Sequence, residues 1–300
     1  MKIVKRAWLL VLICTICFTM TKADSVADIF TLVLICTICF TACGKKKQEP
    51  VSKTMYCDFI NVGKGDAILI RNSGKTIMID TGYEETADTV NGFLEKEKVN
   101  KIDILILSHF DKDHIGGAIS VLKKFDVRKI YMPDYEDEGN KYKDFMEYLK
   151  EKNHEKLAAK VTKRMEFKLG NLEVMIDPCK EKEYKSENNY SLVTKITNDE
   201  DTYLFAGDAE KKRINELLDE DFIMADVMKI PHHGRLDDNS VTFIDRVRPW
   251  FAVCTVASES DVDQVIKDEL NSIDATYYFT CNGNVSCVSD GERNYKFSVE

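Results

Sequence analysis

Short apolar runs separated by turn residues follow one another along the chain from residue 55 onwards. Three runs at 55–63, 65–72 and 76–82 are joined through glycines and predict three successive strands. A continuous apolar run at 102–108 and a shorter run at 128–133 predict two further strands. The first half of the domain is therefore expected to build a sheet.

Helical spacing of apolar residues interrupts these strands. Helices are predicted at 85–99, 116–125, 142–150 and 211–219. In the third of these, an apolar stripe is formed by Tyr142, Phe145, Met146 and Leu149. Such a stripe is typical of a surface helix packed on a core, and a lid over a cleft is the alternative.

Strands return in the second half of the chain. They are predicted at 165–178, 191–197, 202–208, 226–231 and 250–256, with a strand meander at 276–299. Each half of the domain begins with successive strands and continues with alternating strands and helices. This repeated order predicts two mixed sheets with helices outside.

The first 43 residues differ from everything that follows. A basic start and an apolar run at 7–20 are typical of a signal peptide, and LVLICTICFT at 10–19 recurs letter for letter at 32–41. The second copy ends in Thr-Ala-Cys, which resembles the cleavage site of bacterial lipoproteins and implies lipidation of Cys43. The chain then divides into a leader at 1–43, a linker at 44–54 and a globular domain at 55–300.

Two alternatives stay open for this leader. The apolar segments could remain as an uncleaved membrane anchor, and the duplication could reflect a recent copying event or a misassigned start. Both interpretations of the segment predict an extracytoplasmic protein of a bacterium, tethered to a membrane through its N-terminus.

The charge of the chain restricts its partners. The formal net charge is −9, and the leader contributes +2, so the remainder carries −11. Bulk electrostatics therefore do not help this protein to bind nucleic acid, and a polyanionic substrate would have to be held by metal ions and local basic residues.

Cysteine spacing gives no metal site. Five cysteines follow the leader, and none of them forms a CxxC pair, so a cysteine zinc site is not expected. Cys281 and Cys287 flank NGNVS, which has the composition of a hairpin turn. A cross-strand disulfide and two reduced thiols are both open there.

The stretch HFDKDH directly follows the predicted strand at 102–108. Alternate residues of an extended loop point the same way, so His109 and Asp111 can converge on one ion. Asp113 and His114, at the turn into the next helix, can face a second ion. Imidazole and carboxylate together suit Zn²⁺, Mn²⁺ or Fe²⁺.

Two later stretches complete this pattern. LFAGDAE places Asp208 after an apolar strand, and KIPHHG places His232 and His233 after another. Four of the five histidines thus lie in two motifs that each follow a predicted strand.

HxDxDH, then GD after a strand, then PHHG together resemble the metallo-β-lactamase superfamily. Within it the chain most resembles the soluble domain of ComEC-type competence proteins and their stand-alone relatives, with support from FINVGKGDAILI, TIMIDTG, ENNYSLVTKI and VSDG. The resemblance covers about residues 55–300. It implies an α+β fold, an αββα four-layer sandwich, and a metal-dependent hydrolase with a dinuclear site at one edge of the two sheets.

The resemblance also implies a ligand set in two sites. The six ligands are His109, Asp111, Asp113, His114, Asp208 and His232. The first two belong to the first site and the next two to the second. Asp208 would bridge both ions and His232 would complete the second site, with His233 as its less favoured substitute. Asp113 and Asp208 are the candidate catalytic residues.

The sequence departs from the superfamily's usual HxHxDH. Asp111 replaces the second histidine, and ENNYS offers Asn188, Asn189 and Ser191 where a further histidine ligand is usual. We therefore expect two divalent ions, Zn²⁺ or Mn²⁺, with the first site weak or empty, and oxygen-rich ligation also admits Mg²⁺.

Four further residues are candidates around the ions. Asp66 and Asp80 would orient ligands or loops, the alternative being ordinary turn hydrogen bonds next to glycine. Lys112 and Arg235 could contact a substrate phosphate.

The favoured function is a phosphodiesterase or nuclease that uses a metal-activated water on a small-molecule or nucleic-acid phosphodiester. Another envelope hydrolase, such as a lactamase, lactonase or choline-phosphate esterase, is the alternative, although the missing three-histidine site argues against a dedicated β-lactamase. A non-catalytic surface lipoprotein is disfavoured by the complete second site.

Overall fold

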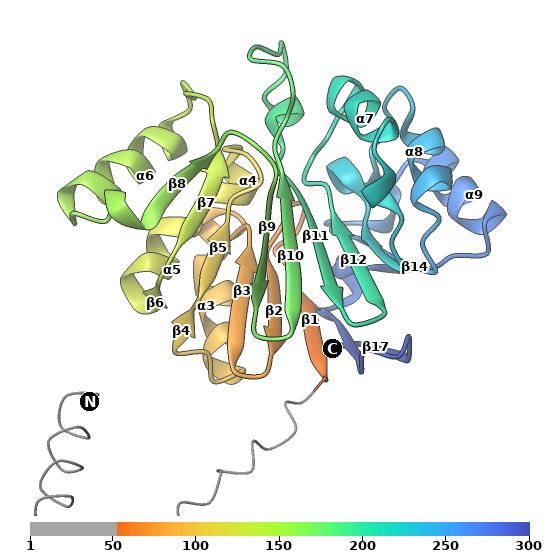
Figure 1. The fold of residues 1–300 in the computed structure, drawn as a ribbon, viewed down its shortest axis with the longest axis horizontal. Helices are drawn as coiled ribbons and strands as arrows, with labels where there is room; N and C mark the ends of the chain where they lie inside the picture. The colour runs from red at the N-terminus through yellow and green to blue at the C-terminus, as the bar shows by residue number, and fades with distance from the viewer. Residues whose placement is uncertain (1–52) are drawn as a thin grey trace, which may run out of the picture. The chain divides into compact units, whose positions relative to one another are not determined.

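Two β-sheets lie face to face between outer layers of helices (Figure 1). The structure, a computed structural model, describes residues 53–300. The chain divides into two units between Val51 and Ser52, and the described residues all belong to the second unit. The predicted leader at 1–43, with Cys43 and most of the linker, lies outside the described residues.

The first sheet has the strand order β17-β16-β1-β2-β3-β5-β7-β8. β1, β2 and β3 are antiparallel neighbours, whereas β3, β5, β7 and β8 run parallel. The bounds are β1 Met55–Phe59, β2 Ile68–Asn72, β3 Lys75–Ile79, β5 Ile104–Ile106, β7 Ile130–Pro133, β8 Ala158–Val161, β16 Val285–Ser289 and β17 Tyr295–Val299.

The second sheet has the order β15-β14-β13-β12-β11-β10-β9. Its strands are antiparallel from β9 to β12 and parallel from β12 to β15. The bounds are β9 Met165–Leu169, β10 Leu172–Asp177, β11 Val193–Asn198, β12 Asp201–Phe205, β13 Val227–Lys229, β14 Phe251–Cys254 and β15 Thr276–Phe279. A small third sheet pairs β4 (Lys101–Ile102) with β6 (Asp126–Val127).

Helices cover the outer faces. Figure 1 shows α5 and α6 at one flank and α7, α8 and α9 at the other. The α-helices are α3 Ala87–Lys96, α4 Lys112–Ile115, α5 Ala118–Lys124, α6 Asn140–Glu151, α7 Lys211–Leu218, α8 Ser240–Val247 and α9 Gln264–Ser272. Short 3₁₀ turns are η1 Glu84–Thr86, η2 Glu155–Leu157, η3 Glu187–Tyr190, η4 Asp221–Ile223, η5 Pro231–Gly234, η6 Glu259–Asp261 and η7 Thr280–Asn282.

Alternating strand residues separate the interior into layers. In β2, Ile68 and Ile70 point into the core between the sheets, and Leu69 packs with the helices of the first sheet. In β12, Phe205 faces the same inter-sheet core, and Leu204 packs with the helices of the second sheet. Because the central strands are covered on both faces, their sequences read as continuous apolar runs. The predicted four-layer αββα sandwich is confirmed.

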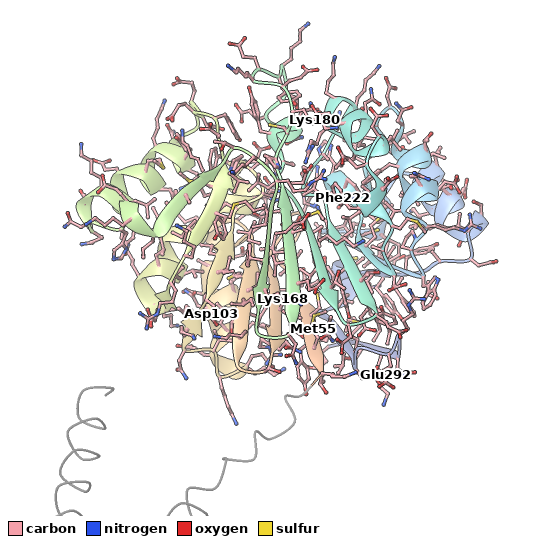
Figure 2. All side chains as sticks on the ribbon, viewed as in Figure 1. Met55, Asp103, Lys168, Lys180, Phe222 and Glu292 are labelled. Atoms are coloured by element: carbon pink, nitrogen blue, oxygen red, sulfur yellow. The ribbon has the colours of Figure 1, made fainter. Side chains whose placement is uncertain are left out.

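One part of the second sheet carries charge on its outer face. Val174 and Ile196 point to the inter-sheet core, so the residues next to them in β10 and β11 point outwards. Lys168 and Phe222, both labelled in Figure 2, line a hollow on this outer face together with Glu173.

The structure corrects two sequence predictions. The tail at 276–299 is not one meander, because β15 joins the second sheet beside β14 while β16 and β17 join the first. Cys287 therefore lies opposite Cys57 of β1 rather than opposite Cys281, and all three thiols are free. Strand β8 at Ala158–Val161 was also not predicted from the sequence.

The helix at 140–151 packs on the core. Tyr142, Phe145 and Leu149 are buried in the apolar layer outside the first sheet, as the favoured interpretation of their spacing predicts. In the described structure their apolar stripe is therefore used for packing.

Parallel strands bring several chain segments to one edge. β3 and β5 run parallel in the first sheet, and β12, β13 and β14 run parallel in the second. The loops that follow the carboxyl ends of parallel strands are where open α/β sheets place ligand-binding residues. All three sequence motifs lie in such loops.

Candidate metal centre

Four side chains distant along the sequence converge in the loops that follow β5, β12 and β13. Asp113, His114, Asp208 and His233 each offer one ligand atom, and these atoms all lie within 4.8 Å of one another. The last three of these residues are buried and Asp113 is partly exposed. Two imidazoles and two carboxylates at this spacing suit a divalent cation such as Zn²⁺ or Mn²⁺.

The glycines after HFDKDH let this loop pack tightly. A side chain at Gly117 would overlap the carbonyl oxygen of Thr81, the second residue after β3. Thr81 in turn donates its backbone N–H to the His114 carbonyl at 2.7 Å. The loop after β5 is thereby fixed against the loop after β3, and His114 is held beside Asp80.

The ring nitrogens that face away from the cluster are hydrogen-bonded. His114 Nδ1 lies 2.8 Å from Asp80 Oδ2, and His233 Nδ1 lies 2.9 Å from the Thr255 carbonyl oxygen. A carbonyl oxygen only accepts, as does an ionised carboxylate, so each Nδ1 carries the proton. The Nε2 lone pairs are then directed to the cluster, an arrangement typical of histidine metal ligands.

The inward ring nitrogens provide the test of whether a metal fits. Nε2 of His109, His114 and His233 is buried in each case and has no hydrogen-bond partner among residues 53–300. An unsatisfied buried polar atom costs about 1–3 kcal/mol. A cation that accepts these lone pairs would remove that cost, so the residues fit a metal centre.

Asp208 lies between the two imidazoles. Its Oδ1 is 3.4 Å from His114 Nε2, and its Oδ2 is 3.0 Å from His233 Nε2. Burial alone would raise the pKa of Asp208, but the charges of His233, His114 and Lys229 outweigh burial and hold it well below its usual range. This carboxylate is therefore ionised and has an oxygen on each side of the cluster.

Asp113 and the imidazoles shift one another's protonation. Burial would raise the pKa of Asp113, but the nearby imidazoles of His233 and His114 lower it to about 2. Burial opposes protonation of His114, yet Asp208 and Asp80 raise its pKa well above 6.5. The pKa of His233 is also raised, because Asp208 outweighs burial. Both shifts favour the protonated form of the imidazoles.

A buried lysine also lies in the centre. Lys229 Nζ lies 2.7 Å from Asp66 Oδ2 and 3.2 Å from Asp208 Oδ1, and it donates to the Gly207 carbonyl at 3.0 Å. Burial would lower the pKa of Lys229, but the two carboxylates raise it. Asp66 also accepts the hydroxyl proton of Thr255 at 2.6 Å.

The structure reverses the expected choice between the adjacent histidines. His233, not His232, belongs to the cluster with Asp113, His114 and Asp208. Both histidines have left-handed backbone conformations, with φ of 48° and 54°. These successive conformations turn the two side chains apart, and the ring centroids lie 6.4 Å from each other. Such strain at non-glycine residues costs about 1–3 kcal/mol each and is concentrated at functional sites.

His232 faces a different group of residues. Its Nδ1 lies 3.6 Å from Glu210 Oε1, and a second group of candidate ligands combines His232 with Glu210 and Asp237. Burial lowers the pKa of His232, with Asp208 and Glu210 opposing, so its imidazole is neutral near pH 7.

His109 and Asp111 lie at the side of the main cluster. The rings of His109 and His114 lie beside each other with centroids 4.1 Å apart and planes tilted by 49°, and His109 Nε2 is 3.7 Å from Asp111 Oδ2. His109 Nδ1 lies 3.0 Å from Ser108 Oγ, whose hydroxyl donates to Asp80 at 2.6 Å. Among residues 53–300, neither His109 nor Asp111 joins a group of three close ligands.

The ENNYS stretch supports the centre from outside. Ser191 Oγ accepts the Asp208 backbone N–H at 3.2 Å, and Asn189 Oδ1 accepts the Arg213 N–H at 2.9 Å. Glu187 of the same stretch is influenced by Asp111, because burial, Asp137 and Asp111 together raise the pKa of Glu187 to about 7.

The remaining sequence candidates separate into two kinds. Asp66 and Asp80 bond to Lys229 and His114, behind the inward-facing ligand atoms. Lys112 and Arg235 are exposed residues next to the cluster in sequence. Their contact with a substrate stays a prediction.

Three residues around the cluster were not found from the sequence. Lys229 interrupts the apolar strand directly before the two histidines, so a lysine at a buried strand end was an available signal. Ser108 directly precedes the histidine motif. Thr255 has no local signal, because its importance comes only from the neighbouring position of β14 in the sheet.

This fold and these residues define a class: a four-layer sandwich with a histidine- and carboxylate-rich centre at one edge, as in metal-dependent hydrolases. The chain belongs to the metallo-beta-lactamase superfamily, whose family model matches residues 60–249. This superfamily is one of metal-dependent hydrolases, as the resemblance predicts.

Known proteins support this assignment. The chain is 25% identical over 224 residues to ComE operon protein 3 of Bacillus subtilis, covering 68% of this chain and 28% of the relative. It is 29% identical over 91 residues to endoribonuclease ysh1 of Schizosaccharomyces pombe, covering 28% of this chain and 12% of the relative. The metallo-beta-lactamase fold protein YhfI from Bacillus subtilis aligns with a TM-score of 0.51 at 12% identity, covering 75% of this chain and 95% of YhfI.

The predicted likeness to ComEC-type competence proteins is confirmed. The chain nevertheless spans only about a quarter of the length of the competence relatives that it matches over two thirds of its own residues. Within the part of the chain that the structure describes, no helix is long and apolar enough to cross a membrane.

Proposed function

We propose that this protein is a metal-dependent phosphodiesterase or nuclease. The observation that carries the proposal is the cluster of Asp113, His114, Asp208 and His233, in which both imidazoles present unpartnered Nε2 atoms next to two carboxylates. Relatives named as a competence-operon protein and as an endoribonuclease favour phosphodiesters over other substrates of the superfamily.

The four cluster residues would hold one divalent cation tightly. Asp208 has its second oxygen directed to the His114 side, so it could bridge to a further cation near His109 and Asp111. That further site has fewer converging ligands, and we expect its affinity to be lower. We favour Mn²⁺ or Zn²⁺, since the donor set mixes nitrogen with ionised oxygen.

When bound, divalent ions lower the pKa of water to about 7 and stabilise charge on a phosphoryl oxygen. The residues of this chain supply the rest. Asp80 and the Thr255 carbonyl hold the protons of His114 and His233 at Nδ1, which keeps both Nε2 lone pairs directed inwards. Lys229 fixes one oxygen of Asp208, and exposed Lys112 and Arg235 would attract a substrate phosphate.

The substrate would be a small phosphodiester or a short single strand. The net charge of −11 beyond the leader opposes long duplex DNA, because duplex binding depends on cationic surface. We place the protein outside the cytoplasm, tethered through lipidated Cys43. Lactamase, lactonase or choline-phosphate esterase activity at the envelope is the second candidate, favoured only by the breadth of the superfamily.

The full-length chain, purified in detergent and loaded with Mn²⁺, is expected to hydrolyse bis(p-nitrophenyl) phosphate. Asp113→Asn should lower turnover about 100-fold or more, because it removes a charged ligand but keeps the shape of the side chain. Release of p-nitrophenol measures the rate. Asp245→Asn changes an exposed carboxylate on α8 that pairs with Arg248, and it should retain the wild-type rate.

Equal inactivity of wild type and Asp113→Asn with Mn²⁺, Zn²⁺ and Mg²⁺ would contradict the phosphodiesterase proposal. Hydrolysis of a lactam, lactone or choline-phosphate ester in the same preparation would then favour the second candidate.

Metal binding is expected to release protons. The pKa values of His114 and His233 are raised above 6.5, chiefly by Asp208, so each imidazole keeps its second proton to a higher pH than usual and must lose it to coordinate a cation. The apparent affinity for Mn²⁺ should therefore increase as the pH rises above 6.5. Calorimetry in buffers of different ionisation enthalpy measures the number of protons released.

The stability of the metal-free protein should show the opposite trend. Folding raises the pKa of His114, so the protonated imidazole stabilises the folded protein. This stabilisation is fully present below pH 6.5, the unfolded-state pKa, and is lost as the pH rises through the folded-state pKa. The Tm in chelator should fall over that range, and saturating Mn²⁺ should suppress the fall. A Mn²⁺ affinity that does not vary with pH would contradict this assignment of the protons.

A further inference from the structure

A second group of potential ligands lies beside the main cluster. Glu210, at the start of α7, His232 and Asp237 offer ligand atoms that lie within 4.8 Å of one another. The cluster described above uses none of these three side chains. They come from two loops at the site edge, the loop that follows β12 and the loop that follows β13.

The imidazole of His232 is the observation that points to a ligand. Its side chain is 9% exposed, and its Nδ1 atom is buried without a hydrogen-bond partner in the part of the chain that the structure describes. That atom faces Glu210 Oε1 at 3.6 Å, which is too far for a hydrogen bond. A buried unsatisfied nitrogen costs about 1–3 kcal/mol, and the left-handed backbone of His232 adds strain. Packing alone gives no reason to keep such a ring in this position.

The surrounding bonds hold these ligand atoms in place and leave room for coordination. Asn188 Nδ2 donates to Glu210 Oε1 at 3.0 Å and lies 3.5 Å from His232 Nε2, so it fixes both side chains. Asp237 accepts the Asp238 N–H through Oδ1 at 2.8 Å. Each carboxylate oxygen has two lone pairs, so both side chains retain acceptor capacity.

We propose that Glu210, His232 and Asp237 form a third divalent-cation site at the rim of the main centre. One imidazole and two carboxylates match the donor preference of Mn²⁺ or Zn²⁺, and waters would complete the shell. The site would also place positive charge on the rim of an acidic protein. If the proposed phosphodiesterase function holds, that charge would help to bind substrate phosphate, but cation binding itself does not depend on that function.

Titration of the full-length chain in detergent with Mn²⁺ alone tests this site. Electron paramagnetic resonance of free Mn²⁺ counts the bound ions without any substrate. We expect His232→Ala to bind one ion fewer than wild type, and His233→Ala to lose a different ion from the main cluster. The double variant should lose both, because the two sites use separate ligands.

Milder variants guard against misfolding of His232→Ala. Glu210→Gln and Asp237→Asn should each weaken the same class of Mn²⁺ sites about tenfold or more. Asp238→Asn changes the neighbouring exposed carboxylate, which pairs with Lys211, and should leave the titration unchanged. The third site is excluded if His232→Ala, Glu210→Gln and Asp237→Asn all titrate like wild type. Inactivity on phosphodiesters with the extra ion still bound would reject the proposed function and leave this site standing.

Discussion

Asp208→Asn is expected to lower turnover about 10⁴-fold, which corresponds to about 5.5 kcal/mol of transition-state stabilisation. Asp208 is the one cluster residue with an oxygen near each inward imidazole, at 3.4 Å from His114 Nε2 and 3.0 Å from His233 Nε2. An amide keeps the shape but loses the charge and one acceptor oxygen. Its NH₂ group could also donate to an imidazole lone pair that coordination requires.

The measurement combines hydrolysis of bis(p-nitrophenyl) phosphate with the Mn²⁺ stoichiometry of the same sample. Asp208→Asn should lose at least one tightly bound ion and keep its fold, because Lys229 retains its bond to Asp66. Asp226→Asn is the matched control. Asp226 is a buried carboxylate that accepts from Thr202 and Tyr295 just before β13, so this variant should lose stability but retain turnover. Full activity of Asp208→Asn would exclude a bridging role.

The layered fold could be predicted because the central strands are buried on both sides. Runs such as ILI in β2 and YLF in β12 are apolar on consecutive positions, and such runs are typical of strands covered by layers on both faces. Strand β8 was missed because its sequence, AAKV, lacks that signal and forms only through pairing with β7. The tail was misassigned because local sequence does not encode which sheet a strand joins. Only the packing of β15 beside β14 separates it from β16.

The sequence predicted which motifs supply the candidate ligands, but not always which residue of a motif faces the cluster. The cluster contains Asp113, His114 and Asp208, which the sequence indicated, but His233 in place of His232. Adjacent histidines have the same local signal, and two successive left-handed conformations decide which ring faces inwards. Thr255 is involved only because the sheet places β14 next to β13, a contact between positions 22 residues apart.

Lys229→Met is expected to destabilise the metal-free protein by about 3–5 kcal/mol, the cost of removing one partner from a buried ion pair. Lys229 is buried and is 2.7 Å from Asp66 and 3.2 Å from Asp208. Methionine keeps most of the side-chain volume, so the loss of stability would come from two carboxylates that no longer have the Lys229 ammonium group beside them. Urea unfolding in chelator measures it. Lys195→Met is the matched control, because Lys195 is a half-buried lysine that donates to the Phe222 and Met224 carbonyls, and less than about 2 kcal/mol should be lost.

The pH dependence identifies the cause of the destabilisation. In wild type, Lys229 and the neighbouring imidazoles outweigh burial and lower the pKa of Asp66. The Asp66 carboxylate therefore stabilises the fold above its unfolded-state pKa near 3.8, and this stabilisation is lost as the pH falls through its folded-state pKa. Without Lys229, burial should raise that pKa, and the variant should instead gain relative stability as the pH falls. Asp66→Asn combined with Lys229→Met should recover part of the loss. If the loss of stability in Lys229→Met does not depend on pH and Asp66→Asn does not reduce it, Lys229 contributes packing rather than charge.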